Sequence, residues 1–132
     1  MKSRRDPAPV SGGMTNALPL AMVRLTVTLV ASQSGARLLL DAFRSLMGPT
    51  RLEPGCLGCL VWEEIDDDST LRYAEEWATE ADMRRRVMSD RFTSLLAVME
   101  GATAPPQVQF HFVAMTRGLD YVAEIRHCGI EA

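Results

Sequence analysis

Apolar residues repeat along this chain at two different spacings, one typical of strands and one typical of helices. The order of these segments is the strongest constraint on its fold. The segment MVRLTVTLVA, residues 22–31, alternates apolar with polar side chains and is rich in β-branched residues. This pattern is typical of a strand with one buried face. Residues 34–47 instead place apolar side chains three and four positions apart, which predicts a helix with one apolar stripe that ends at Gly48-Pro49.

The middle of the chain predicts a hairpin followed by a second helical stretch. Two strand-like runs, Leu57–Ile65 and Leu71–Trp77, flank the acidic connector DDDST. An acidic, turn-rich connector between two such runs indicates a β-hairpin. Thr79 can cap the helix that follows, and the apolar stripe continues to Met99, before Gly101 and a pair of prolines.

Val108–Met115 alternates again, and we interpret Tyr121–Arg126 as a last short strand. The predicted order is therefore β-α-β-β-α-β with a further C-terminal strand. This is the ferredoxin-like, split βαβ arrangement of an α+β protein, in which an antiparallel sheet carries its helices on one face. Because the helices cover one face alone, we expect a second copy to bury the other face in a homodimer, with the C-terminal strand crossing over.

Length, charge and the N-terminal residues limit the classes of protein to consider. The 132 residues suit one domain, which we place at residues 22–132 after a flexible leader at 1–21. The basic start imitates a signal peptide, but an Asp/Pro/Gly stretch follows, and no apolar run is long enough to span a bilayer. We therefore expect a cytoplasmic location. The net charge of −3 gives no electrostatic argument for binding nucleic acid or an anionic membrane.

The sequence CLGC at residues 56–59 could be a redox dithiol, half of a metal site, or two small structural side chains. A reactive dithiol needs a helix N-terminus to lower the pKa of its thiol, whereas this pair lies where a loop enters a predicted strand. Zinc would need a second pair of ligands, and Cys128 is the one further cysteine. Residues three apart in a strand point to opposite faces. We interpret both thiols as structural and expect no metal, haem or flavin.

Two segments resemble the antibiotic biosynthesis monooxygenase family. RLEPGCLGCLVWEE, residues 51–64, resembles the entry to that family's second strand, and YAEEWATEADMRRRVMSDRF, residues 73–92, resembles its third strand and the helix after it. The resemblance covers roughly residues 22–126 and implies a dimeric α+β barrel. Characterised members include cofactor-free oxygenases of polycyclic quinol-type substrates, quinol monooxygenases and haem-degrading enzymes. The matching positions are Glu75, Trp77, Thr79, Ser89 and Phe92.

The chain departs from the family pattern at two positions where many relatives carry histidine. Arg86 stands at the first of these positions and Arg91 at the second, and no His lies between Trp77 and Pro105. A haem-degrading site requires a helix His as the iron ligand. We therefore do not expect haem degradation.

The resemblance directs Trp77 toward the cavity between sheet and helices, and strand alternation brings Tyr73 and Glu75 to the same face. A buried carboxylate must be paired, or its pKa rises. Glu75 is therefore a candidate general base toward a phenol or quinol. Alternatively, it forms a structural ion pair with Arg86, and both interpretations stay open.

The remaining candidates have equally plain structural alternatives. Trp77 could stack on a flat aromatic substrate or belong to the core, and Arg86 could stabilise a substrate oxyanion. His111 points away from Phe110 and Phe112, so it is more typical of a structural residue. If it faces the cavity instead, it is the histidine that would shuttle protons. The substrate-binding candidates are Trp77, Tyr73, Trp62 and Phe92.

Two functions from different classes follow. The first is a cofactor-independent monooxygenase that oxidises an aromatic quinol- or phenol-like small molecule with O₂. In it, Glu75 is base or proton relay, Trp77 the stacking wall and Arg86 the anion clamp, with His111 as a further catalytic candidate. The alternative is a non-catalytic small-molecule-binding dimer with the same cavity. The missing histidines favour the second and the Glu-x-Trp pattern favours the first.

Overall fold

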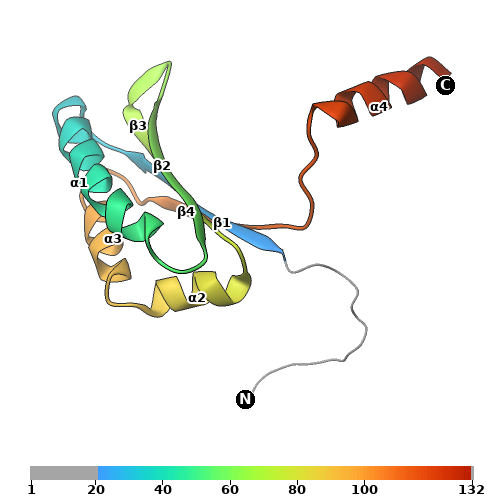
Figure 1. Cartoon of the computed structure of the whole chain (residues 1–132). Helices are drawn as coiled ribbons and strands as arrows, with labels where there is room; N and C mark the ends of the chain where they lie inside the picture. Colours follow the sequence, from blue (N-terminus) through green and yellow to red (C-terminus); the bar gives the residue numbers. More distant parts are fainter. Residues whose placement is uncertain (1–20, 132) are drawn as a thin grey trace.

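The computed structural model describes residues 21–131, so the predicted leader lies outside the described residues except for Ala21. Figure 1 shows α1, α2 and α3 gathered on one side of the sheet, while α4 projects away from it. The elements in chain order are β1 (Met22–Val30), α1 (Gln33–Arg51), β2 (Cys56–Glu64), β3 (Asp67–Trp77), α2 (Glu80–Met88), α3 (Phe92–Met99), β4 (Gln107–Val113) and α4 (Leu119–Glu131).

The four strands form one antiparallel sheet in the order β2-β3-β1-β4. This confirms the predicted α+β, ferredoxin-like fold. The alternation of β1 sets the register, because its apolar residues lie opposite the inward residues of β3. Leu25 pairs with Glu75, and Val27 pairs with Tyr73.

The core fills the space between the sheet and the helices α1 and α3. Leu25, Val27 and Leu29 of β1 are fully buried there, as predicted from the alternating pattern. Phe43 of α1 stacks on Tyr73 with ring centroids 4.9 Å apart, which fixes the helix over β3. The face opposite the helices carries polar pairs instead.

Helix α1 does not end at Gly48-Pro49 as predicted but runs on to Arg51. Proline lacks a backbone N–H, so Pro49 removes one hydrogen bond near the helix end, where few remain to be lost. The Thr50 hydroxyl donates to the Leu46 carbonyl at 2.7 Å, and the Leu52 N–H donates to the Pro49 carbonyl at 3.2 Å. These bonds close the last turn despite the proline.

The stretch predicted as one helix up to Met99 is divided into α2 and α3 by Ser89, whose backbone is extended. The backbone N–H of Ser89 donates to the Arg86 carbonyl at 3.1 Å, and its hydroxyl donates to the same oxygen at 2.7 Å. Serine competes in this way for the last carbonyls of a helix. The break lets the start of α3 turn back over the end of α1.

The predicted last strand at Tyr121–Arg126 is wrong, because these residues belong to α4. The short alternation there is overridden by contacts at helical spacing. The guanidinium of Arg117 lies 4.2 Å from the ring centroid of Tyr121, and its Nη2 donates to Glu124 at 2.6 Å. All residues from Leu119 to Cys128 are exposed.

The two cysteines of CLGC do not point to opposite faces as expected. Cys56 pairs with Trp77 and Cys59 with Glu75, so both lie on the helix-covered side. A register shift between Cys56 and Gly58 inserts one extra residue, and such a β-bulge changes which side chains share a face. Within residues 21–131, no helix is long and apolar enough to cross a membrane.

Candidate functional site

The site is organised around the carboxylate of Glu75, which is fully buried at 0% exposure on the inner face of β3. Strand alternation places Tyr73 and Trp77 on either side of it. The Tyr73 hydroxyl donates to Oε2 at 2.5 Å, and the Trp77 indole N–H donates to Oε1 at 3.0 Å. Two neighbours on the same strand therefore hold the carboxylate in one orientation.

Helix α2 supplies the opposite charge through Arg86, whose side chain is 2% exposed. Thr79 caps this helix as predicted, since its hydroxyl accepts from the Asp82 N–H at 3.1 Å. The Nη2 of Arg86 donates to Oε2 of Glu75 at 2.8 Å, and its Nε donates to Oε1 at 3.1 Å. The structural ion pair left open by the sequence is thus present.

The pair is extended on both sides by further polar groups. The Nη1 of Arg86 donates to Oε2 of Glu53 at 3.2 Å, and the Cys59 thiol donates to the Tyr73 hydroxyl at 3.3 Å. Burial alone would lower the pKa of Arg86, but its hydrogen bonds and charge attraction with Glu75 outweigh this and raise it. Arg86 therefore stays cationic in the interior.

The titrating groups around Glu75 are held in their neutral forms. Burial, and then the charge of Glu75, raise the pKa of Tyr73 far above its usual range. Burial raises the pKa of Cys59 to about 11 and also raises the pKa of Cys56. Neither thiol is activated as a nucleophile, in agreement with their structural interpretation.

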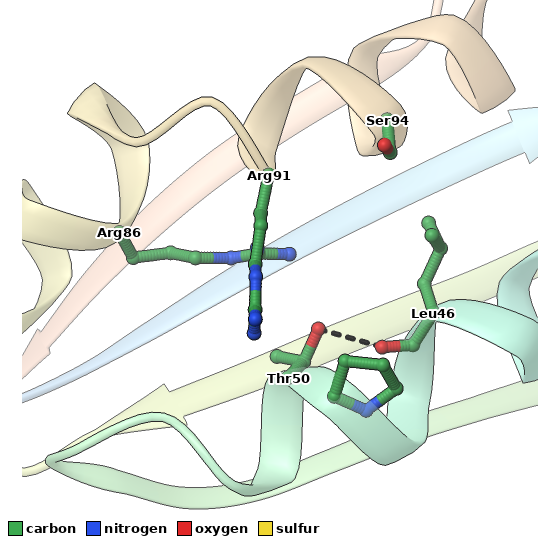
Figure 2. A pocket seen from close by; sticks show the side chains of 6 residues that line it. Leu46, Thr50, Arg86, Arg91 and Ser94 are labelled. Atoms are coloured by element: carbon green, nitrogen blue, oxygen red, sulfur yellow. Dashed lines mark hydrogen bonds between the residues drawn. The ribbon is translucent and has the colours of Figure 1, made fainter.

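A pocket of about 260 Å³ opens beside this network, between the end of α1 and the start of α3. Figure 2 shows Arg91 extending from α3 toward Thr50 on α1, with Arg86 entering from α2. Among residues 21–131, no carboxylate is found in the lining of this pocket. Its lining residues are Leu46, Pro49, Thr50, Arg86, Arg91 and Ser94.

Five of the predicted site residues are brought together and two are not. Tyr73, Glu75, Trp77 and Arg86 form the buried network, and Phe92 lies under Arg86, with the guanidinium carbon 5.3 Å from the ring centroid. Of the five, Arg86 alone is among the residues lining the pocket. Trp77 and Tyr73 are completely buried, so both are core residues in the single chain.

His111 and Trp62 lie on the open face of the sheet, away from Glu75. The Nε2 atom of His111 is 3.3 Å from the Thr26 hydroxyl, and His111 pairs in register with Arg24. Trp62 pairs with Arg72 and is 41% exposed. Neither residue shares the helix-covered space with the pocket.

Four residues of the site were not singled out by their sequence pattern: Glu53, Thr50, Ser94 and Arg91. Arg91 had a signal, because it replaces a histidine of the resembling family. Glu53 and Thr50 lie at a helix end that was predicted to stop earlier, so no periodicity placed them toward Arg86. Ser94 falls on the polar side of the predicted stripe.

A second hollow of about 330 Å³ lies between α2 and β4 and is mainly apolar. Met83, Val87, Phe110 and Phe112 supply most of its apolar side chains. Among the described residues 21–131, no group of three His, Cys, Asp or Glu side chains is arranged to hold a metal ion.

Comparisons with known structures agree with this fold. A candidate antibiotic biosynthesis monooxygenase from Deinococcus radiodurans superposes with a TM-score of 0.67 at 20% identity, covering 74% of this chain and 97% of that one. A conserved protein from Methanosarcina mazei superposes with a TM-score of 0.65 at 19% identity, covering 71% of this chain and 94% of that one. A Bacteroides thetaiotaomicron protein of unknown function is described as a possible oxidoreductase. It superposes with a TM-score of 0.64 at 15% identity, covering 71% of this chain and 99% of that one.

No curated protein matches this chain significantly. The family model described as antibiotic biosynthesis monooxygenase matches residues 22–97, which span β1 through most of α3 and include Glu53, Glu75, Arg86 and Arg91. That match covers more than half of the chain. The chain therefore belongs to the antibiotic biosynthesis monooxygenase family.

Proposed function

We propose that this protein is a cofactor-independent monooxygenase that oxidises an aromatic quinol- or phenol-like small molecule with O₂. The observation that carries the proposal is the placement of Arg86, a buried cation that Glu75 fixes at the wall of a pocket. A permanent positive charge next to a phenol favours its anion. The phenolate is the form of the substrate that can give an electron to O₂.

The proposed reaction needs no cofactor because a quinol can supply all four electrons that O₂ takes up. One quinol and one O₂ give one hydroxyquinone and one water, so that one oxygen atom enters the ring and the other leaves as water. The phenolate first transfers one electron to O₂. The two radicals then combine at a ring carbon, and loss of water completes the oxidation.

In this proposal Glu75 is a positioning residue and not the general base. Its two oxygens already accept from Tyr73, Trp77 and Arg86, and it does not line the pocket. The phenol proton passes instead to solvent, which reaches the pocket past the exposed Arg91 and Ser94. Arg86 and Arg91 act by stabilising the anion that remains.

A second function, the non-catalytic binding of a small molecule, is favoured by a different observation. Tyr73 and Trp77, the two aromatic rings beside Glu75, are fully buried and leave no aromatic wall for a flat substrate. A pocket with two arginines and an apolar side can bind an anion without any redox step. Both functions would use the same pocket.

Oxygen uptake with a panel of single-ring and polycyclic quinols separates the two. The monooxygenase proposal expects uptake that saturates with quinol, resists metal chelators and falls at least tenfold in Arg91→Gln. Binding of a quinol without oxygen uptake above the uncatalysed rate would leave the binding function in place of the enzyme.

A further inference from the structure

We propose that this pocket selects a monoanionic, single-ring ligand bearing a carboxylate or phenolate, and that Glu53 weakens the binding of that anion. The proposal rests on the proposed function for the location of the site, and it names the class of ligand. It follows from the donors that face the pocket, the charges behind them and the size of the space.

Arg86 has donors to spare for a ligand. A guanidinium carries five N–H groups. The N–H at Nε and one N–H at Nη2 donate to Glu75, and one N–H at Nη1 donates to Glu53. Two N–H groups are left without an acceptor among the hydrogen bonds of the described residues, and Arg86 is among the pocket's lining residues.

Arg91 adds a second cation that no carboxylate neutralises within the described part of the chain. Its guanidinium takes part in none of the ion pairs or hydrogen bonds among residues 21–131, although all three arginines of α2 find acidic partners. Figure 2 shows its side chain reaching into the space beside Arg86. An anion between two guanidiniums gains charge-assisted hydrogen bonds from both.

The rest of the lining fits a small ring. Ser94 offers a hydroxyl donor, whereas the Thr50 hydroxyl donates to the Leu46 carbonyl and can accept from a ligand. Leu46 and Pro49 form an apolar side on which a ring can lie. The ligand that matches has one charged end, one apolar body and one further polar group.

The volume of the pocket matches a ligand of one ring. A space of about 260 Å³ corresponds to the liquid volume of about nine water molecules at roughly 30 Å³ each. A hydroxybenzoate or a small quinol has a similar number of non-hydrogen atoms, while a polycyclic quinol has about twice as many. The pocket therefore favours the former over the polycyclic substrates of some family members.

The carboxylates behind the pocket set the ligand's charge. Glu75 and Glu53 both pair with Arg86, whereas neither pairs with Arg91, so the one positive charge of Arg91 is matched by a monoanion and a dianion gains less. Glu53 is the less firmly held of the two carboxylates. Its side chain is 17% exposed and makes a single 3.2 Å contact, so it competes with the ligand for Arg86.

Titration calorimetry of the full chain under anaerobic conditions tests the proposal without relying on turnover. The probes are 4-hydroxybenzoate, the neutral 4-hydroxybenzamide of the same shape, and 2-naphthoate as the larger anion. We expect 4-hydroxybenzoate to bind at least tenfold more tightly than either of the others. Thermal melts of each variant show whether it is folded.

Three variants assign the effect to residues. Arg91→Gln should weaken the binding of 4-hydroxybenzoate about tenfold. Glu53→Gln should strengthen the binding severalfold, because the competing carboxylate charge is gone. Arg84→Gln is the matched control, since Arg84 lies on the same helix as Arg86 but pairs with Glu80 away from this pocket, and it should leave binding unchanged.

The proposal is overturned if 4-hydroxybenzamide binds as tightly as 4-hydroxybenzoate, if folded Arg91→Gln binds like the wild type, or if no probe binds at millimolar concentration. Selective anion binding without oxygen uptake from any quinol would retain this inference and remove the proposed oxygenase. Oxygen uptake that falls at least tenfold in Arg91→Gln, together with equal binding of 4-hydroxybenzoate and 4-hydroxybenzamide, would retain the oxygenase and remove this inference.

Discussion

The carboxylate of Glu75 and the guanidinium of Arg86 are buried together, and each is held by further hydrogen bonds. Two buried charges cost desolvation energy that their attraction offsets when the geometry is good. Removing one partner leaves the other charge unpaired in the interior. Losing either member of the pair therefore lowers the stability of the fold, whatever the pair does in catalysis.

Glu75→Gln should destabilise the protein by about 3–5 kcal/mol, because Arg86 loses its main counter-ion in a buried position. Tyr73→Phe is the milder companion variant, since it removes one hydroxyl donor and should cost about 1.5–3 kcal/mol. Urea unfolding followed by tryptophan fluorescence measures both. A Glu75→Gln protein as stable as the wild type, with turnover abolished, would return Glu75 to the role of general base.

Cys59 should resist alkylation in the folded protein up to mildly alkaline pH, whereas the exposed Cys128 reacts. Burial raises the pKa of Cys59 to about 11, so its thiol stays protonated where a free thiol, with a pKa of about 8.5, ionises. The stability linked to this shift is complete below the unfolded pKa and is lost as pH rises through the folded one.

Iodoacetamide labelling with peptide mass spectrometry, in native buffer and in urea, measures the cysteine prediction. Rapid native labelling of Cys59 at neutral pH would show that the thiol is not shielded as described.

The residue-level expectations succeeded where strand alternation alone fixes a side chain. Tyr73, Glu75 and Trp77 share one face because a strand has a period of two. The pocket's other residues come from the ends of two helices, where neither period applies. Their positions depend on how long α1 runs and where α2 stops, which are decided by tertiary contacts.

At the scale of elements, the turn into β2 is a tight point of the fold. Gly55 has a φ of 85°, and a Cβ built there would lie 2.2 Å from Cγ of Asp82. Asp82 is held in place by Thr79 and Arg85. The turn therefore packs directly against the first turn of α2, and α2 carries Arg86 near its other end.

Gly55→Ala should lower stability by at least about 1–2 kcal/mol, because a side chain is strained at positive φ and collides with Asp82. Gly48→Ala is its control within α1, where a Cβ meets nothing within 4 Å. There the gain in helix propensity is opposed by the restriction that Pro49 places on the residue before it, so the change should alter stability by less than about 1 kcal/mol. Equal effects of the two substitutions in thermal melts would contradict this description of the turn.

Two of the wrong predictions, the end of α1 and the last strand, share one cause. Both the continuation of α1 through Pro49 and the helix at α4 depend on hydrogen bonds and ring contacts three to seven residues apart. Those contacts outweighed a short alternation, which is a weak local preference, and a proline in the last turn of a helix, where it costs less than the roughly 3 kcal/mol of a helix interior. The long alternating segments β1 and β4 had no such competitor.

At the scale of the whole molecule, the open face of the sheet and α4 are the surfaces without a cover in the single chain. The open face carries ion pairs such as Arg24 with Glu76, together with the exposed Leu60 and Trp62. We propose that two copies pack through this face, as the resemblance implied. Figure 1 shows α4 leaving the body of the chain, where it could reach a second copy.

Trp62→Glu should shift the protein from dimer to monomer, because it replaces an exposed apolar side chain of the proposed interface with a charge. Leu38→Glu is the control, since Leu38 is exposed on α1, on the opposite side of the sheet. Sedimentation should give a mass near twice 14.6 kDa for wild type and control. A wild type that sediments as a monomer at micromolar concentration would remove the dimer.

The overall fold followed from the order of periods along the sequence, because a β-α-β-β-α-β series with short connections has few compact solutions. The pocket could not be obtained in the same way. Its cations were visible in the sequence, but their convergence beside α1 depends on how far α1 runs and on the break after α2.

We propose above all that this protein inserts one atom of O₂ into a quinol without a cofactor. The most direct measurement is the mass of the product formed from a single-ring quinol under ¹⁸O₂ by the chelator-treated protein. We expect a hydroxyquinone carrying one ¹⁸O atom, with the second atom in water. An unlabelled quinone with hydrogen peroxide, or no product above the uncatalysed reaction, would contradict it.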